Sequence, residues 1–232
     1  MTGPGASDGR RAAVRATAVL VSGWVLLVAV VVAFGLVLTG PLEGSVGHGD
    51  NRLERGFAAD RSGTLTHVAD VVTLLGETVT VLSLGAVLLL GTWFWKHQIR
   101  PVVFVAAALL GEIAAYLATV SLVSRDRPPV RILDPGLDPS HSYPSGHVAA
   151  SVALYGALAV LIWRTGRRGW RGVCVALAAV PLLVGVARMY LGAHHLSDVV
   201  TSLVFMSVWL AFAAAVLLRE PRSGAGASAE SP

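Results

Sequence analysis

Long apolar stretches alternate with short polar segments along the whole chain. A helix that crosses the hydrocarbon core of a bilayer needs about 20 mostly apolar residues, and each apolar stretch comes close to that length. The pattern therefore predicts an all-α fold, a polytopic membrane bundle of six transmembrane helices. The six apolar runs lie near residues 16–39, 66–92, 101–124, 147–163, 173–191 and 197–218.

Two polar tails flank the predicted bundle. We expect an amino-terminal tail over residues 1–15, a helical membrane domain over residues 16–218 and a disordered tail over residues 219–232. The outermost segments, residues 1–9 and 221–232, are rich in Gly, Ser and Ala, a composition typical of disorder. The first apolar run is longer than the roughly 7–15 residues of a signal-peptide core, so we expect it to be retained as an anchor.

The composition agrees with a membrane protein and excludes both a soluble domain and a disulfide-rich protein. Hydrophobic residues make up 54% of the 232 residues and charged residues only 14%, whereas soluble domains carry roughly 25% charged residues. The formal net charge of +4 would indicate nucleic acid binding in a soluble protein. In a membrane protein such an excess sets the topology, so we expect the bilayer as a partner and no nucleic acid. The single cysteine, Cys174, excludes a disulfide framework.

The charged residues are sorted between the two sides of the predicted bundle. The tails and every second linker carry eleven Lys and Arg and three acids, whereas the other linkers and adjoining run ends carry seven Arg and nine acids. Cytoplasmic segments carry the excess of Lys and Arg. We therefore expect a multi-pass protein of the cell membrane with both termini cytoplasmic. The first set comprises Arg10, Arg11, Arg15, Lys96, Arg100, Arg164, Arg167, Arg168, Arg171, Arg219 and Arg222, with Asp8, Glu220 and Glu230.

Residues that suit chemistry gather in two segments on the opposite, outer side. The first segment ends with Pro144-Ser145-Gly146-His147, directly before the fourth apolar run. A helix start presents unpaired backbone N–H groups and the positive end of the helix dipole, and a glycine there lets an anion approach the backbone. This turn therefore predicts a phosphate cradle, with a simple helix cap as the alternative interpretation.

The second outer segment runs from Arg188 to Asp198. His194 and Asp198 are four residues apart, so on a helix they would share a face and the carboxylate could hold the imidazole. A histidine oriented in this way is a candidate nucleophile or base. The neighbouring His195 would face about 100° away, with no acid four residues later. Arg188 at a membrane-buried helix end requires an anionic partner.

The two segments together suit a phosphoryl group. Arginine forks and backbone amides hold phosphate oxygens, one histidine can attack phosphorus, and another can protonate the leaving oxygen. This chemistry requires no metal and no cofactor. The arginines in question are Arg127 and Arg188, and the histidines are His147 and His194.

The same residues resemble the three-part signature of the type 2 phosphatidic acid phosphatase family, membrane lipid phosphatases related to vanadium haloperoxidases. The resemblance covers roughly residues 65–218 and rests on Arg127-Pro128, on Pro144 to His147, and on Arg188-x5-His194-x3-Asp198. It implies a helical bundle with its active site at the outer membrane face.

The resemblance also implies roles for individual residues. His194 would form a phosphohistidine intermediate and His147 would act as general acid, then as base when water attacks. Asp198 would orient His194. The residues that would bind the phosphate are Arg127, Ser145, Gly146 and Arg188.

Two positions depart from the family pattern. The first motif usually opens with a Lys where this chain has Val120, and the third usually opens with a Ser where it has Ala187. The missing Lys removes one cation from the phosphate pocket. Arg125 or Arg131 would replace it, or both are solvated loop charges, which seldom contribute much.

These residues predict a lipid phosphate phosphatase acting on phosphatidic acid, a polyprenyl diphosphate or a similar lipid at the outer membrane face. One alternative is a lipid phosphotransferase with the same intermediate. A second is a metal-dependent hydrolase or transporter with ligands His147, His194, His195 and Asp198, although two nearby arginines would repel a divalent cation. A third is a non-catalytic lipid-binding protein that keeps the pocket.

Two further features leave alternatives open. Glu77 and Glu112 lie within apolar runs, where an ionisable residue marks function. Alternatively, each is protonated or is paired with a hydroxyl group such as that of Thr80 or Tyr116. The outer loop over residues 40–65 is either a short amphipathic helix on the membrane or a solvated connector.

Overall fold

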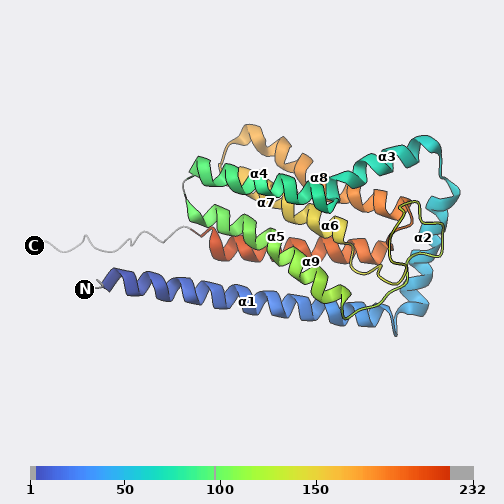
Figure 1. Ribbon diagram of the computed structural model, residues 1–232, viewed down its shortest axis with the longest axis horizontal. Coiled ribbons are helices and arrows are strands. Elements are labelled where there is room, and N and C mark those ends of the chain that lie inside the picture. The colour runs from blue at the N-terminus through green and yellow to red at the C-terminus, as the bar shows by residue number, and fades with distance from the viewer. Residues whose placement is uncertain (1–3, 97, 220–232) are drawn as a thin grey trace, which may run out of the picture.

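The computed structural model describes residues 4–96 and 98–219, which are helical apart from short connections and contain no strand (Figure 1). The α-helices are α1 (Pro4–Leu38), α2 (His48–Ala59), α3 (Gly63–Thr73), α4 (Thr78–Lys96), α5 (Ile99–Val120), α6 (Gly146–Ser151), α7 (Ala157–Trp163), α8 (Arg171–Tyr190) and α9 (Leu196–Leu217). Shorter helical turns cover Glu43–Gly47, Leu74–Gly76, Val152–Gly156 and Arg168–Trp170. The turn Val152–Gly156 joins α6 to α7 in one continuous helix.

The described residues contain five helical stretches long and apolar enough to cross a membrane, and α3 with α4 forms a sixth that is bent by 44°. The all-α prediction is therefore confirmed, and six spans result when the bent pair counts as one. The bend lies at Gly76 and Glu77, where Glu77 adopts extended backbone angles. A Cβ atom on Gly76 would lie 2.6 Å from the carbonyl oxygen of His147, so only glycine lets the bend approach the start of α6 this closely.

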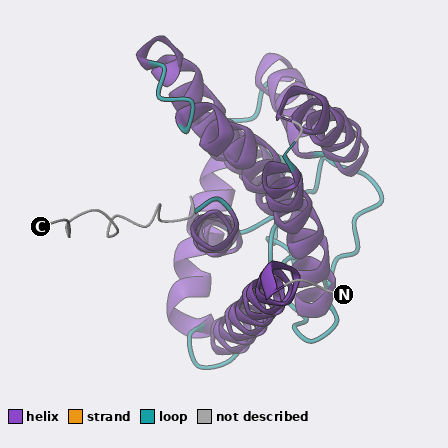
Figure 2. Cartoon of the chain, turned by 90° about the vertical axis from the view of Figure 1, so that its left-hand side faces the viewer, coloured by secondary structure: helices purple, strands orange, loops and turns teal. Residues whose placement is uncertain are grey.

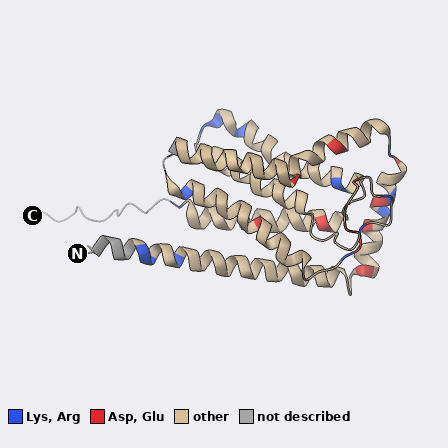
Figure 3. Cartoon of the chain, in the orientation of Figure 1, with Lys and Arg blue, Asp and Glu red and all other residues tan. Residues whose placement is uncertain are grey.

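Both ends of the described chain lie at one end of the bundle, and α2 lies at the other (Figure 1). Lys and Arg without acids mark the end with the termini, whereas both signs of charge occur near α2 (Figure 3). This is the separation on which the topology prediction rests, and a cytoplasmic location of the termini stays a prediction. The side chains of Asp8, Lys96, Glu220, Arg222 and Glu230 lie outside the described residues.

Helix α1 starts earlier than the apolar pattern predicts. It begins at Pro4, so residues 4–9, predicted to be disordered, are helical, and residues 10–15 continue the same helix. Arg and Ala are strong helix formers, and the segment Arg10-Arg11-Ala12-Ala13 extends the apolar helix without a break. The predicted disordered tail after residue 219 lies outside the described residues.

Helix α5 lies in the middle of the bundle and contacts α1, α4 and α9. Figure 2 views this packing from the end that holds the termini. Two tryptophan side chains donate hydrogen bonds to backbone carbonyls of α5, Trp24 to Gly111 at 2.9 Å and Trp209 to Ala107 at 3.0 Å. A Cβ atom on Gly111 would lie 2.5 Å from Trp209 Nε1. These contacts fix the rotation of α5 and thereby which of its side chains face the active-site end of α4 and α6.

Candidate active site

The predicted motifs meet at the α2 end of the bundle. The loop over residues 121–145 connects α5 to α6 there, and residues 191–195 connect α8 to α9. A cavity of about 330 Å³ lies between these segments and α4. One part of its wall is apolar, with Val81, Leu82, Leu109 and Ile113 among its residues. The other part holds five of the seven predicted site residues: Arg127, Gly146, His147, Arg188 and His194.

The Pro-Ser-Gly-His turn forms the start of α6, as the sequence predicts. Ser145 is the N-cap residue, but its side chain makes no capping hydrogen bond. Its Oγ atom is buried and has no partner among the described residues. A Cβ atom on Gly146 would lie 3.0 Å from the ring of Tyr116. Because Ser145 does not cap the helix, the simple cap interpretation loses its support, and the hydroxyl group is free for a ligand.

Arg188 is fully buried at the carboxyl end of α8. Its Nη1 atom donates to Asp134 Oδ2 at 2.7 Å and to Thr73 Oγ1 at 3.1 Å. Asp134 is therefore the anionic partner that a buried arginine requires. The remaining donors, Nε and Nη2, have no partner among the described residues, so part of the guanidinium group stays free beside the cavity.

Arg127 joins the two loops. Its Nε atom donates to the carbonyl oxygen of Asp138 at 2.7 Å, and its Nη1 atom donates to the carbonyl oxygen of Ala193. Burial and the nearby Arg188 charge lower the pKa of Arg127. Two arginine side chains thus line one cavity, and an anion bound between them would be favoured by both charges.

His194 is held differently from the prediction. Helix α9 begins at Leu196 with His195 as its N-cap, so His194 precedes the helix and the spacing of helical faces does not apply to it. Its Nδ1 atom lies 2.6 Å from the carbonyl oxygen of Ser142, whereas Asp198 Oδ2 is 3.9 Å away. The expected direct hydrogen bond from His194 to Asp198 is therefore wrong.

The Ser142 contact determines the tautomer of His194. A carbonyl oxygen can only accept, so Nδ1 carries the proton and Nε2 keeps its lone pair. Burial, followed by the charges of Arg188 and Arg127, lowers the pKa of His194 well below its ordinary value. A neutral imidazole with a free nitrogen in a cavity lined by cations can act as a nucleophile.

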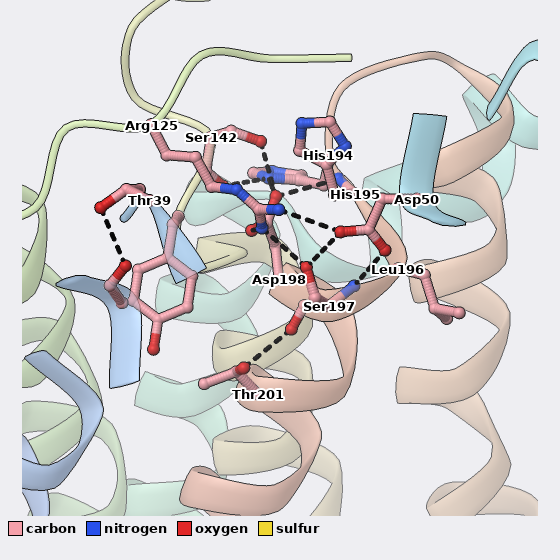
Figure 4. Close-up of polar contacts among 12 residues, drawn as sticks. Thr39, Asp50, Arg125, Ser142, His194, His195, Leu196, Ser197, Asp198 and Thr201 are labelled. Atoms are coloured by element: carbon pink, nitrogen blue, oxygen red, sulfur yellow. Dashed lines mark hydrogen bonds and ion pairs between the residues drawn. The ribbon is translucent and has the colours of Figure 1, made fainter. Parts of the chain in front are cut away.

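Asp198 acts on His194 through Ser142 (Figure 4). Its fully buried carboxylate accepts hydrogen bonds from Ser142 Oγ at 2.6 Å and from the His195 backbone N–H at 2.9 Å. It also forms an ion pair with Arg125 Nη1. Because Ser142 contributes both its hydroxyl to Asp198 and its carbonyl to His194, the acid orients the histidine indirectly.

Arg125 belongs to a buried polar network that the sequence did not reveal (Figure 4). Besides Asp198, it pairs with Asp50 of α2, with 2.9 Å between Nη2 and Oδ2. It is only 8% exposed and does not line the cavity. Both predicted alternatives, a replacement for the missing Lys and a solvated charge, are therefore wrong for Arg125. Arg131, in contrast, is exposed.

Helix α2 contacts the start of α9 through acids. Asp50 accepts from the Ser197 backbone N–H at 3.2 Å, and Glu54 accepts from the Leu196 backbone N–H at 3.1 Å. The segment is a helix, but its buried residues are these two acids, while Leu53 is exposed. The helical interpretation of this loop therefore holds for residues 48–59, and the position of the helix on the membrane stays a prediction. Two acids four residues apart are the sequence signal for its buried face.

His195 lies outside the catalytic cavity. Its Nε2 atom is 3.1 Å from the carbonyl oxygen of Asp126, and it lines a separate, more open polar cavity of about 850 Å³. No group of three or more His, Cys, Asp or Glu within the described part of the chain is placed to hold a metal ion. The geometry therefore gives no support to the four-residue metal site considered above.

Comparisons with known proteins agree with the motifs. A family model described as the PAP2 superfamily matches residues 100–222, more than half of the chain, and this range includes every predicted site residue. No curated protein sequence matches the chain. Among solved structures, the chain is similar to "the first transmembrane PAP2 type phosphatidylglycerolphosphate phosphatase from Bacillus subtilis".

The similarity to that crystal structure covers 85% of this chain and 98% of the Bacillus subtilis chain, with a TM-score of 0.66 and 19% sequence identity. At this identity the similarity shows a shared fold. The family match and the shared transmembrane fold support a membrane lipid phosphatase in general. The chain belongs to the PAP2 superfamily.

Proposed function

We propose that this protein is a lipid phosphate phosphatase that hydrolyses a phosphomonoester or diphosphate of a lipid at the outer membrane face. The observation that carries the proposal is the shape of the 330 Å³ cavity, which joins the polar residues Arg127, His147, Arg188 and His194 to an apolar wall in one space. A head group fits the polar part, and the adjoining hydrocarbon fits the apolar part.

The free donors at the site are suited to phosphate oxygens. Arg188 offers Nε and Nη2, Ser145 offers its hydroxyl, and the first turn of α6 offers backbone N–H groups at Gly146 and His147. Arginine binds phosphate with parallel hydrogen bonds, and amides at a helix start add the favourable end of the helix dipole. Together with Arg127 they stabilise the charge that builds up on phosphorus-bound oxygens during transfer.

Hydrolysis then proceeds in two displacements. His194 Nε2 attacks phosphorus, the bond from phosphorus to the lipid oxygen breaks, and His147 donates a proton to that oxygen. Water next attacks the phosphohistidine, His147 takes a proton from the water, and the bond from phosphorus to His194 breaks to release phosphate. Asp198 supports both steps because it fixes Ser142, whose carbonyl oxygen holds His194.

The predicted topology gives the membrane side on which the cavity opens, and the chemistry gives the requirements of the reaction. With cytoplasmic termini, the cavity faces the extracytoplasmic side of the cell membrane, and lipid substrates approach within the bilayer. The reaction uses no metal and no cofactor, so full activity is expected in excess chelator. A lipid phosphotransferase would share the first displacement and differ only in its acceptor, so phosphate release without an added alcohol separates the two.

The test is phosphate release from lipid substrates in detergent micelles. His194→Ala and His147→Ala should each abolish release while expression and membrane insertion persist, because one removes the nucleophile and the other removes the proton donor. His67→Ala, which changes an exposed histidine of α3, is the matched control and should keep wild-type activity. Activity near the wild-type level in His194→Ala would overturn the mechanism.

A further inference from the structure

Glu112 is a buried acid in the catalytic cavity that the phosphate chemistry does not use. It lies in the middle of α5, is only 6% exposed, and lines the same cavity as His147 and His194. Neither Thr80 nor Tyr116, the hydroxyl partners considered from the sequence, forms a hydrogen bond with it, and no other described residue does. A buried polar group without a partner costs free energy, so its retention in an apolar wall requires an explanation.

The packing of α5 presents Glu112 to the cavity. The preceding residue, Gly111, lies against Trp209 on one side of the helix and accepts the hydrogen bond of Trp24. Successive residues of a helix are rotated by about 100°, so with Gly111 held against the tryptophans, Glu112 faces the cavity. The tryptophan contacts at Gly111 thus hold α5 in the rotation that places Glu112 at the cavity.

The position of Glu112 along α5 relates it to the phosphate site. Tyr116, one helical turn later, lies against Gly146 at the phosphate turn. Glu112 precedes Tyr116 by four residues, or about 6 Å along the helix axis, and α5 runs towards the outer loop. The carboxyl group therefore lies about one helical turn deeper in the bundle than the phosphate-binding residues, beside the part of a lipid that directly follows its phosphate.

Lipid phosphates differ in what they carry at this depth. A phosphorylated glycerolipid has the ester oxygens or a free hydroxyl group of glycerol there. A protonated carboxyl group donates a hydrogen bond to an ester oxygen, and a carboxyl group in either protonation state accepts one from a hydroxyl group. A polyprenyl chain has only hydrocarbon beyond its phosphates and would leave the carboxyl group unpaired. A site built to hydrogen-bond a substrate group rejects the analogue that lacks it.

Given the phosphatase function proposed above, we propose that Glu112 is a specificity-determining residue that hydrogen-bonds to the glycerol portion of the substrate. The substrate class of this enzyme is accordingly a phosphorylated glycerolipid, such as phosphatidic acid or its lyso form, in preference to a polyprenyl diphosphate. The hydrogen bond forms in the ground state and in the transition state alike, so it lowers KM more than it changes kcat.

The experiment compares Glu112→Leu, Glu112→Gln and wild type on dioleoyl phosphatidic acid and undecaprenyl diphosphate in the same micelles. In Glu112→Leu, kcat/KM for phosphatidic acid should fall about tenfold through KM, while the value for the polyprenyl diphosphate is unchanged or rises. Glu112→Gln, which keeps an acceptor and a donor, should restore most of the loss. Glu77→Leu, the other acid of the apolar runs, is exposed and outside the cavity, so it should alter neither substrate.

A binding measurement separates this inference from the proposed function. In a His194→Ala background, which prevents turnover, phosphatidic acid should raise the thermal unfolding temperature, and the added Glu112→Leu change should remove most of that rise. Dependence on Glu112 without phosphate release by the wild type would retain the inference and reject the phosphatase. An equal loss for both lipids, or no loss for phosphatidic acid, would overturn the inference itself.

Discussion

Two groups of buried polar residues lie side by side at the outer end of the bundle, and they differ in how completely their atoms are hydrogen-bonded. In the network below α2, the charged atoms of Arg125, Asp50 and Asp198 bond to one another and to backbone N–H groups. Beside the cavity, Ser145 Oγ and two nitrogen atoms of Arg188 have no partner within the described chain. The residues compared, Arg125, Asp50, Asp198, Ser145 and Arg188, are all buried.

This difference separates residues that support the site from residues that bind the substrate. Buried polar atoms in proteins are almost always paired, so unpaired donors beside a cavity indicate where a ligand supplies the partner. Near the network, His195 Nδ1 and Glu54 Oε2 also lack a hydrogen-bond partner among the described residues, and they lie 3.8 Å apart. There the two unpaired atoms face each other rather than the catalytic cavity.

The largest effect that distinguishes the hydrogen-bonded network from the cavity is expected at Arg125. Arg125→Leu leaves Asp50 and Asp198 buried without their cation, which should lower the free energy of unfolding by about 3–5 kcal/mol. Thermal and denaturant unfolding in detergent measure this loss. Arg131→Gln changes an exposed arginine of the same loop and serves as the control. An Arg125→Leu protein as stable as wild type would show that the network does not support the fold.

A change at Arg188 should reduce activity strongly and stability only slightly, the reverse of a change at Arg125. Arg188→Lys keeps a cation for Asp134 but loses the planar guanidinium group, two nitrogen atoms of which have no partner within the described chain. We expect kcat/KM for phosphate release to fall about 10²–10³-fold, with a much smaller change in unfolding temperature than in Arg125→Leu. Retention of more than about a tenth of the wild-type activity would contradict a role of the free nitrogens in phosphate binding.

The smallest effect concerns the pH dependence of activity. Burial and the charges of Arg188 and Arg127 lower the pKa of His194, and His194 must be neutral to attack. The acid limb of kcat/KM that belongs to His194, which reports the free enzyme, should therefore lie below the ordinary histidine value of about 6.5. Arg127→Gln removes one of the two cations, so the pKa rises and the limb moves to higher pH.

Profiles that extend well below the ordinary histidine pKa of about 6.5 test this shift. Arg127 also contacts phosphate, so the height of the profile falls in Arg127→Gln, and the position of the limb is the relevant quantity. Arg131→Gln should leave the limb where it is. A limb that moves to lower pH in Arg127→Gln would contradict the electrostatic account of His194.

The spans could be predicted from the sequence because the length of an apolar run is a local property. The bend between α3 and α4 could not, since it depends on the contact between Gly76 and the carbonyl oxygen of His147, residues 71 positions apart in the chain. The same limit applies to α2. Its buried acids bond to the start of α9, and nothing in residues 40–65 reveals that partner.

The site shows the same division between local motifs and tertiary contacts. Arg127, His147, Arg188 and His194 were identified from motifs and do line one cavity. The support of His194 could not be predicted, because its spacing to Asp198 indicates a shared helical face whereas α9 begins only at Leu196. Ser142 was not singled out, because its carbonyl and hydroxyl groups matter only once two distant loops meet.

The contact between α2 and α9 has a consequence for exchanging parts between relatives. The family match begins at residue 100, yet Asp50 and Glu54, which bind the backbone at the start of α9, lie well before it. A chimera that takes only the matched segment from another superfamily member would keep these two carboxylates but replace the part of α9 that they contact. The helix α2 and the start of α9 should therefore be exchanged together, although about 140 residues separate them along the chain.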